Sequence, residues 1–353
     1  MVLQHNPFLR YHQTSSSDNP FQGPLAEAVR YDYINSQLPM EREGGLYTTI
    51  LPIYEWSASH LVDALKDHTS IERRSRILDL GSGTGAATRM ILPVQGFAHI
   101  TGIEQSEGML EVANYKFHKK ETQEFERKIQ ELFNGNVPEQ LSSYWQAVRT
   151  ETEQDQNLVR FIQGDLRRIT DLVDHDYDAA IANQSLHWLG DDLPAFFTSL
   201  RDVLSANGIA IWNSASDFIE DNIYHSAEFS FRYNDFMGMI CEKLSQKGYA
   251  VGDYKNFRRP KWKTEEIEGY IKDSGFTMEQ KRTILVRDDF QRYLSLDLPL
   301  MLSGLLHDKG ISLEDTEKLA RETAAEIINE CSNFMADTQH KYDITPIFVM
   351  RKK

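Results

Sequence analysis

Three closely spaced glycines follow an aspartate in the stretch Arg76 to Thr88, where an apolar run ends on Asp79 and becomes the turn Gly81-Ser82-Gly83-Thr84-Gly85. Glycines lack a Cβ, so their backbone adopts left-handed conformations without strain and approaches a ligand closely. The helix expected after the turn points its free N–H groups at whatever occupies the turn. Glu104 ends the next apolar run, at the spacing from which a carboxylate accepts hydrogen bonds from both hydroxyls of a ribose. This pattern predicts a nucleotide site.

Two classes of nucleotide fit the glycine turn. Gly81 to Ala86 satisfies the G-x-G-x-x-[GA] dinucleotide pattern, and Glu104 satisfies its second condition. Asp79 opposes a dinucleotide, because a carboxylate pointing into the turn repels a pyrophosphate and suits a cationic amine or sulfonium. Asp165, in Gly164-Asp165-Leu166 after a later strand, can accept a hydrogen bond from an exocyclic amine such as that of adenine. The polar-then-aromatic run from Asn183 to Trp188 ends a further strand, where the reactive end of the nucleotide should meet a second substrate.

Strands alternate with helices around these residues, which predicts a doubly wound, mostly parallel α/β sheet with helices on both faces. We expect two helices, Ala26 to Leu38 and Tyr47 to Leu65, before the first strand. The final two strands should lie antiparallel at the sheet edge, and Asn207-Gly208 should be a turn between a helix and a strand. The expected strands are Arg76 to Leu80, His99 to Ile103, Val159 to Gln163, Tyr177 to Asn183, Gly208 to Ser214, Phe276 to Val286 and Ile344 to Met350.

The remaining segments surround this sheet. Residues 1–24 are polar and lack apolar periodicity, so we expect a loose arm, with one α/β domain over 25–353. Residues 119–157 are charged and rich in glutamine, and their apolar residues at helical spacing predict a helical insertion on the surface. Helical segments 25–70, 217–262 and 288–340 should form a substrate cap, since aromatic residues are abundant in the second of them.

Composition excludes several classes of partner. The 353 residues carry a net charge of -15, which opposes binding to nucleic acid or anionic membranes. No stretch approaches the roughly 18 apolar residues of a membrane span, and Met1 to Asn19 lacks the apolar core of a secretion signal. Cys241 and Cys331 stand apart, and His187 and His225 have no carboxylates at a metal-ligand spacing, so we expect neither disulfide nor metal. We expect a cytoplasmic monomer or homodimer.

Together, these motifs resemble the class I S-adenosylmethionine-dependent methyltransferases over about Ile77 to Ser214. Asp79 to Gly85 looks like the first motif of that group, Glu104 its ribose acid, Gly164 to Leu166 its adenine-side acid and Ala182 to Leu189 its fourth-strand motif. The run from Asn183 to Trp188, followed by Asp191-Asp192-Leu193, is most similar to small-molecule members such as the trans-aconitate and juvenile hormone acid methyltransferases. The insertion 119–157 departs from their pattern.

The resemblance implies direct displacement of a methyl group from S-adenosylmethionine to an O, N or C atom of a small metabolite that is apolar or bears a carboxylate. The implied cofactor contacts are Asp79, Gly81, Gly83, Gly85, Glu104, Gln105, Met109, Asp165, Leu166 and Asn183. Expected substrate contacts are Trp188, Tyr33, Tyr54, Trp56 and Tyr224. His187 is the candidate general base, because a neutral imidazole takes protons near pH 7.

Several alternatives stay open from the sequence. Asp79 can instead cap the following helix, and His187 can instead bind a substrate carboxylate or pack beneath the cap. The whole chain can be an S-adenosylmethionine-binding protein that catalyses a non-methylating rearrangement or binds a partner. An NAD-dependent oxidoreductase is the third class, and the charge of Asp79 disfavours it.

Overall fold

The computed structural model describes residues 25, 28–29, 32, 53–68, 75–94, 97–118, 122–133, 135–153, 156–214, 233–249, 262–288, 318–319, 322–327 and 341–353. The chain divides into two compact units. The larger unit comprises Pro20–Ala215, Trp262–Ile284 and Thr345–Lys353 and holds most of the central sheet; the smaller comprises Met1–Asn19, Ser216–Lys261 and Leu285–Ile344. No helix within the described residues is long and apolar enough to cross a bilayer.

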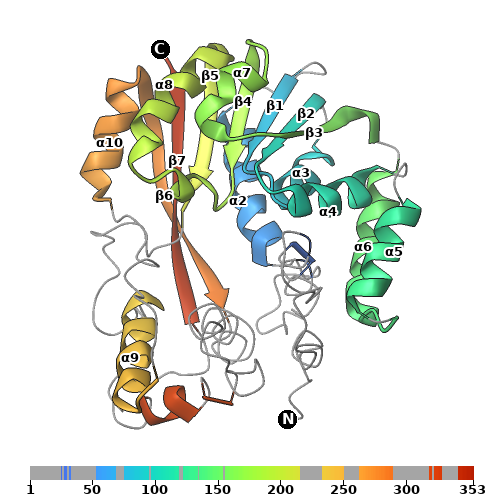
Figure 1. Ribbon diagram of the computed structural model, residues 1–353. Coiled ribbons are helices and arrows are strands. Elements are labelled where there is room, and N and C mark those ends of the chain that lie inside the picture. Colours follow the sequence, from blue (N-terminus) through green and yellow to red (C-terminus); the bar gives the residue numbers. More distant parts are fainter. Residues whose placement is uncertain are drawn as a thin grey trace, which may run out of the picture. The chain divides into compact units, whose positions relative to one another are not determined.

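A seven-stranded sheet with the order β3-β2-β1-β4-β5-β7-β6 forms the centre of the fold (Figure 1). Its strands are β1 Ser75–Leu80, β2 Phe97–Glu104, β3 Val159–Gln163, β4 Tyr177–Ala182, β5 Leu204–Asn213, β6 Phe276–Asp288 and β7 Lys341–Lys352. The pairs β1–β2, β2–β3, β1–β4 and β4–β5 are parallel, whereas β7 runs antiparallel to β5. The predicted doubly wound, mostly parallel sheet is confirmed.

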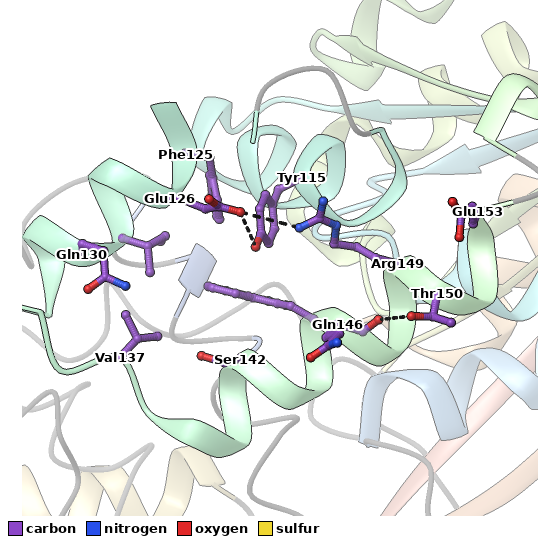
Figure 2. A pocket seen from close by; sticks show the side chains of 12 residues that line it. Tyr115, Phe125, Glu126, Gln130, Val137, Ser142, Gln146, Arg149, Thr150 and Glu153 are labelled. Carbon is purple, nitrogen blue, oxygen red and sulfur yellow. Dashed lines mark hydrogen bonds and ion pairs between the residues drawn. The ribbon is translucent and has the colours of Figure 1, made fainter. Parts of the chain in front are cut away.

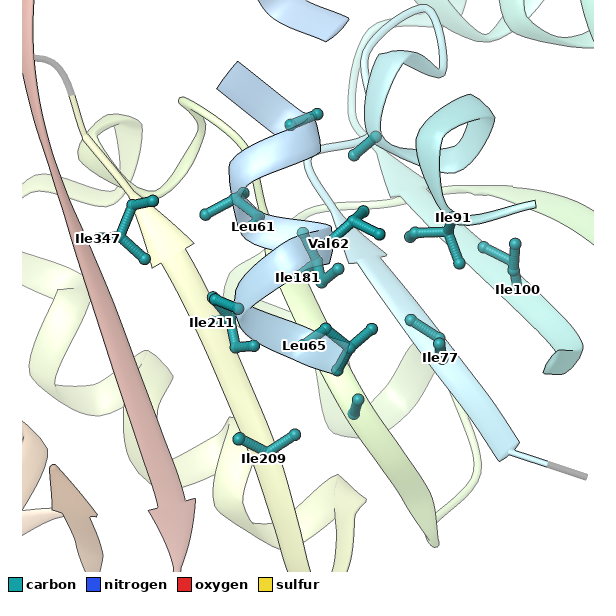
Figure 3. Packing of buried hydrophobic residues seen from close by; sticks show 14 of the residues in the cluster. Leu61, Val62, Leu65, Ile77, Ile91, Ile100, Ile181, Ile209, Ile211 and Ile347 are labelled. Carbon is teal, nitrogen blue, oxygen red and sulfur yellow. The ribbon is translucent and has the colours of Figure 1, made fainter. Parts of the chain in front are cut away.

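Helices cover both faces of this sheet. On one face, α2 (Ile53–His68) packs Leu61 and Leu65 against Ile77, Ile181 and Ile211, which project from neighbouring strands (Figure 3). α3 (Ala86–Ile91) and α4 (Glu107–Phe117) contribute to the same core. The other face carries α8 (Leu193–Val203), where Phe197 lies 5.9 Å from Trp212 of β5, between ring centroids. α7 (Ile169–Leu172) and α10 (Thr264–Asp273) pack against α8.

Most predicted elements are present, with one local difference at β5. This strand begins at Leu204 rather than Gly208, and its register shifts because Tyr177 pairs with Leu204 while Ala179 pairs with Ile209. The predicted Asn207-Gly208 turn therefore lies inside the strand as a bulge, where Asn207 has a φ of 64°. The strand continues through the turn because β4 pairs with β5 on both sides of the bulge.

The insertion consists of two helices, α5 (Thr122–Leu132) and α6 (Glu139–Thr152), beside α4 (Figure 1). The apolar stripe of α5 is buried, as its helical spacing predicts; it comprises Phe125, Ile129, Leu132 and, just after the helix, Phe133. Val148 of α6 joins the main core beneath the sheet. A cavity of about 460 Å³ lies at the insertion. Its lining residues include Tyr115, Phe125 and Arg149 (Figure 2). The insertion is therefore joined to the domain through buried contacts.

Several expectations fall largely outside the described residues. They include the N-terminal arm, most of the first predicted helix and most of the predicted cap. In the smaller unit, the structure describes α9 (Tyr233–Gln246) and parts of helix at 318–319 and 322–327. Lys247 Nζ lies 2.7 Å from Glu326 Oε1 in that unit. The cap itself stays a prediction.

Candidate functional site

A cavity of about 320 Å³ opens at the carboxyl ends of β1, β2, β3 and β4. The sequence runs outward from β1 to β3 and then returns to β4 on the other side of β1, so this is the switch point at which open α/β sheets bind ligands. The predicted site residues that line it are Tyr54, Asp79, Gly81, Gly83, Glu104, Gln105, Met109, Asp165, Leu166, Asn183 and Trp188. The fold therefore gathers most of the predicted set around one space.

The three loop glycines have positive φ angles of 65°, 53° and 90° but different surroundings. A Cβ on Gly81 would lie 2.5 Å from Ser185 Cβ, and one on Gly85 would lie 2.5 Å from Phe117 Cε2. A Cβ on Gly83 would meet nothing within 4 Å. Gly81 and Gly85 therefore allow close packing, and Gly85 is not among the described residues that line the cavity. Gly83 is the position where the backbone itself faces open space.

Asp79 is buried at the end of β1, with 1% of its surface exposed. Its Oδ2 atom accepts hydrogen bonds from the Thr88 amide at 3.0 Å and the Thr88 hydroxyl at 2.6 Å, which ties it to α3. Its Oδ1 atom has no hydrogen-bond partner among the described residues. Burial raises the pKa of Asp79 to about 6, against the lowering effect of Thr88. One oxygen therefore bonds to α3, and the other has no partner among the described residues, although Asp79 lines the cavity.

Glu104 is held by backbone amides on both sides. Its Oε2 atom accepts from Gly83 N at 3.0 Å and its Oε1 atom accepts from Ser106 N at 2.8 Å. The first bond fixes the glycine loop, and the second fixes the start of α4, whose N-cap is Ser106. A carboxylate oxygen accepts more than one hydrogen bond, so Glu104 keeps capacity for ligand hydroxyls.

The loop after β3 presents a second carboxylate to the cavity. Asp165 Oδ1 accepts from the Arg167 amide at 3.0 Å, and this backbone hydrogen bond lowers the pKa of Asp165, with further lowering by the Arg167 side chain. Arg167 Nε also lies 2.6 Å from Asp192 Oδ2. Arg167 also lines the cavity and was not predicted from the sequence. Its position two residues after Asp165 could have indicated that it lies at the site. Its pairing with Asp192 could not be predicted, because the fold brings these two residues together.

Asn183 uses its side-chain amide to join α2 to the sheet. Its Oδ1 atom accepts from Ser57 Oγ at 2.7 Å and from Asn213 Nδ2 at 3.1 Å, while its Nδ2 atom donates to the Tyr54 carbonyl at 2.9 Å. The next residue, Gln184, has a φ of 56° and also lines the cavity. Such a conformation is uncommon outside glycine and is concentrated at functional sites. Asn183 therefore positions Tyr54 at the cavity wall.

The two aromatic candidates after β4 have opposite environments. Trp188 is 64% exposed and lines the cavity, whereas His187 is 5% exposed and is not among the described lining residues. Their ring centroids lie 5.0 Å apart. Trp56 packs against His60 at 4.5 Å and is also not among the described lining residues. Tyr33 and Tyr224 lie outside the described residues.

Metal ligands are a further possibility for a site rich in carboxylates. In the part of the chain that the structure describes, no group of three or more His, Cys, Asp or Glu side chains is arranged to hold an ion.

Comparison with known proteins gives one match in sequence. Residues 78–210 match the family model described as a methyltransferase domain, and this segment contains the glycine loop, Glu104, Asp165 and Asn183. No curated protein matches the chain. The matched segment runs from within β1 to within β5, so it contains the carboxyl ends of the strands β1 to β4 that border the cavity.

Several solved structures are similar at low identity. The [4+2]-cyclase SpnF is 14% identical with a TM-score of 0.48, and the match covers 95% of this chain and 96% of that one. YcgJ from Bacillus subtilis is 14% identical with a TM-score of 0.46, covering 83% and 98%. Phosphoethanolamine N-methyltransferase 2 of Haemonchus contortus, solved with S-adenosyl-L-methionine, is 15% identical with a TM-score of 0.44, covering 99% and 60%. These distant likenesses define no activity for this chain.

Substitution of two loop glycines tests the packing difference between them. Gly85→Ala should destabilise the protein by about 2–4 kcal/mol, because a methyl group would overlap Phe117 in a left-handed backbone. Gly83→Ala should cost about 1–2 kcal/mol, since it adds backbone strain without overlap. Urea denaturation measures both free energies of unfolding, and equal losses would contradict the assigned surroundings.

The stability of the empty protein should depend on the ionisation of Asp79. Its pKa is about 6 when folded and 3.8 in the reference state, so ionisation destabilises the folded state as pH rises from about 4 to about 6. Asp79→Asn should therefore become more stable than the unsubstituted protein above pH 6, by up to about 3 kcal/mol. Below pH 4 this advantage disappears, because the carboxyl is protonated in both states.

Denaturation of both proteins at pH 4 and pH 8 measures that difference. Asp165→Asn is the control, because the pKa of Asp165 is lowered and its ionised form stabilises the fold. A stability difference for Asp79→Asn that does not change with pH would show that Asp79 has an ordinary pKa.

Proposed function

We propose that the chain is a class I methyltransferase whose methyl donor is S-adenosylmethionine. The observation that carries the proposal is the buried Asp79 carboxylate, whose Oδ1 atom has no hydrogen-bond partner among the described residues. The donor carries an ammonium and a sulfonium, and a cation in that place compensates the buried charge. A dinucleotide would bring a pyrophosphate toward the same carboxylate. The methyltransferase-domain match over residues 78–210 supports the same assignment.

The lining residues suit the remaining parts of this donor. Glu104 accepts from the ribose hydroxyls while it holds the loop, and the open backbone at Gly83 admits the donor close to the chain. Asp165 accepts from the adenine amine, with Met109 and Leu166 beside the base. The bound donor supplies an electrophilic methyl group. The protein aligns this group with the acceptor and excludes water, which accounts for most of the acceleration in a direct displacement.

The acceptor is a small metabolite with apolar surface or a carboxylate, similar to the substrates of trans-aconitate and juvenile hormone acid methyltransferases. Tyr54 and the exposed ring of Trp188 form aromatic parts of the cavity wall near Asn183. The net charge of -15 favours a small acceptor over a nucleic acid. His187 acts as the general base where the acceptor needs one; its ring centroid lies 5.0 Å from that of Trp188, which lines the cavity.

The proposed donor site is tested by removal of the ribose carboxylate. Glu104→Ala should weaken S-adenosylmethionine binding by about 1.5–3 kcal/mol, because charged hydrogen bonds to the ribose and to Gly83 are lost. Glu107→Ala, an exposed glutamate at the start of α4, is the matched control and should bind normally. Calorimetric titration measures both affinities, and unchanged binding by Glu104→Ala would remove Glu104 from the site.

Methyl transfer itself is tested by release of S-adenosylhomocysteine in a screen of metabolite classes. Release with any acceptor supports a methyltransferase. Tight donor binding without release across the screen would favour the alternative of a non-methylating protein that uses the same donor.

A general base at His187 affects turnover and not donor binding. With the acceptor identified by the screen, His187→Gln should lower kcat by about 100-fold and leave the Kd for S-adenosylmethionine unchanged. Trp188→Ala, on the neighbouring cavity wall, should instead raise the KM of the acceptor. If His187→Gln changes kcat and the Kd equally, the buried imidazole has a structural role.

A further inference from the structure

Asp32 is a fully buried carboxylate that joins three separate segments of the chain. Its Oδ1 atom accepts from the Thr84 hydroxyl at 2.7 Å, and its Oδ2 atom accepts from Trp145 Nε1 at 2.6 Å. Lys116 Nζ lies 3.1 Å from Oδ2 and 3.2 Å from Oδ1. Thr84 belongs to the glycine loop, Lys116 to the end of α4 and Trp145 to the insertion. The carboxylate therefore connects the insertion to the loop through two hydrogen bonds.

Thr84 is the side chain through which this contact reaches the glycine loop. It lies between Gly83 and Gly85, which have no side chains, and it is 7% exposed and lines the cavity. Glycines on both sides leave the backbone many accessible conformations. The hydroxyl bond to Asp32 removes much of that freedom, as does the bond from Gly83 N to Glu104.

The residue before Trp145 bonds to a second buried carboxylate, which is paired with the helix that follows the loop. Tyr144 donates its hydroxyl to Glu55 Oε1 at 2.8 Å, and burial raises the pKa of Tyr144, so it remains a donor. Arg89 of α3 donates to both oxygens of Glu55, at 2.8 Å and 2.7 Å, and also pairs with Glu151 of α6. Helix α6 is therefore connected to the loop through Asp32, and separately to α3 through Glu55 and through the pair of Glu151 with Arg89.

An aromatic cluster formed by α4 and the insertion fixes the position of Trp145. Its ring centroid lies 5.5 Å from that of Tyr115 and 5.6 Å from that of Phe125, both edge-on. Figure 2 shows Tyr115 and Phe125 side by side, with Arg149 and Glu126 next to them. Since the ring has packed neighbours and its Nε1 atom reaches Asp32, the insertion places a hydrogen-bond donor at a defined point next to the loop.

We propose that the insertion at 119–157 acts as a brace for the donor-binding loop, with Trp145 and Asp32 as positioning residues that act through Thr84. The brace holds Gly83 and Thr84 in the ligand-ready conformation before the donor arrives, so that binding does not have to order the loop. The effect on donor affinity rests on the proposed function, whereas the ordering of the empty loop does not.

The experiment compares two substitutions within one aromatic cluster. Trp145→Phe keeps an aromatic ring and removes the donor to Asp32, while the control Tyr115→Phe removes a hydroxyl that bonds to Glu126 instead. Hydrogen exchange of the empty protein is followed in a peptide spanning residues 81–88. Trp145→Phe should speed exchange there about tenfold, and Tyr115→Phe should leave it within about twofold.

Thr84→Val provides a second variant if Trp145→Phe does not fold. It should speed exchange of the same peptide, and the double variant should exchange no faster than either single variant, because both act on one connection. Equal exchange in Trp145→Phe and Tyr115→Phe, or additive effects in the double variant, would overturn the brace.

Donor titration of the same proteins separates the brace from the proposed function. Trp145→Phe should raise the Kd for S-adenosylmethionine about tenfold relative to Tyr115→Phe. Faster hydrogen exchange of the loop together with an unchanged Kd for the donor would overturn the role of the brace in binding. No donor binding by the unsubstituted protein would overturn the proposed function, and loop exchange would still decide whether the insertion orders the loop.

Discussion

Buried carboxylates at the carboxyl edge of the sheet are the constraint on which the site depends. Asp32, Glu55 and Asp79 are each at most 1% exposed, and a buried charge is costly unless it is paired. Lys116 pairs with Asp32 and Arg89 with Glu55. Asp79 has hydroxyl and amide donors from Thr88 but no salt bridge within the described residues. Among these three carboxylates, Asp32 and Glu55 are compensated by cationic side chains and Asp79 is not, within the described part of the chain.

The difference between the paired carboxylates and Asp79 affects both the stability of the protein and the charge of the ligand that the cavity favours. The two compensated carboxylates hold α2, α3, α6 and the glycine loop around the cavity, so they supply rigidity. The third lies at the cavity wall with a raised pKa, because its ionised form is poorly solvated. A cationic ligand lowers that cost, and an anionic one increases it. Sites of this kind exchange some stability of the empty protein for ligand affinity.

Local sequence patterns were sufficient to predict the sheet and much of the cavity. Asp79, the glycine turn and Glu104 lie close together in the chain, and strand ends bring Asp165 and Asn183 to the same edge by a general rule of parallel sheets. Contacts between distant segments were not predictable. Gly81 and Gly83 differ because Ser185, which follows β4, packs against Gly81 and not against Gly83.

The same limit applies to side chains whose role depends on burial. His187 follows the cavity-lining segment in sequence, yet the short helix after β4 turns it inward and places Trp188 outward. Asp32 gives no sequence signal of its own, because its partners are separated from it by 52, 84 and 113 positions. Arg167 likewise needs the approach of Asp192. These features arise from packing and not from any motif.

The most direct test of the central claim is a calorimetric titration of the unsubstituted protein at neutral pH with S-adenosylmethionine and, separately, with NAD. We expect saturable binding of one S-adenosylmethionine per chain and no binding of NAD, because Asp79 favours a cation and repels a pyrophosphate. Binding of NAD without binding of S-adenosylmethionine would contradict the central claim.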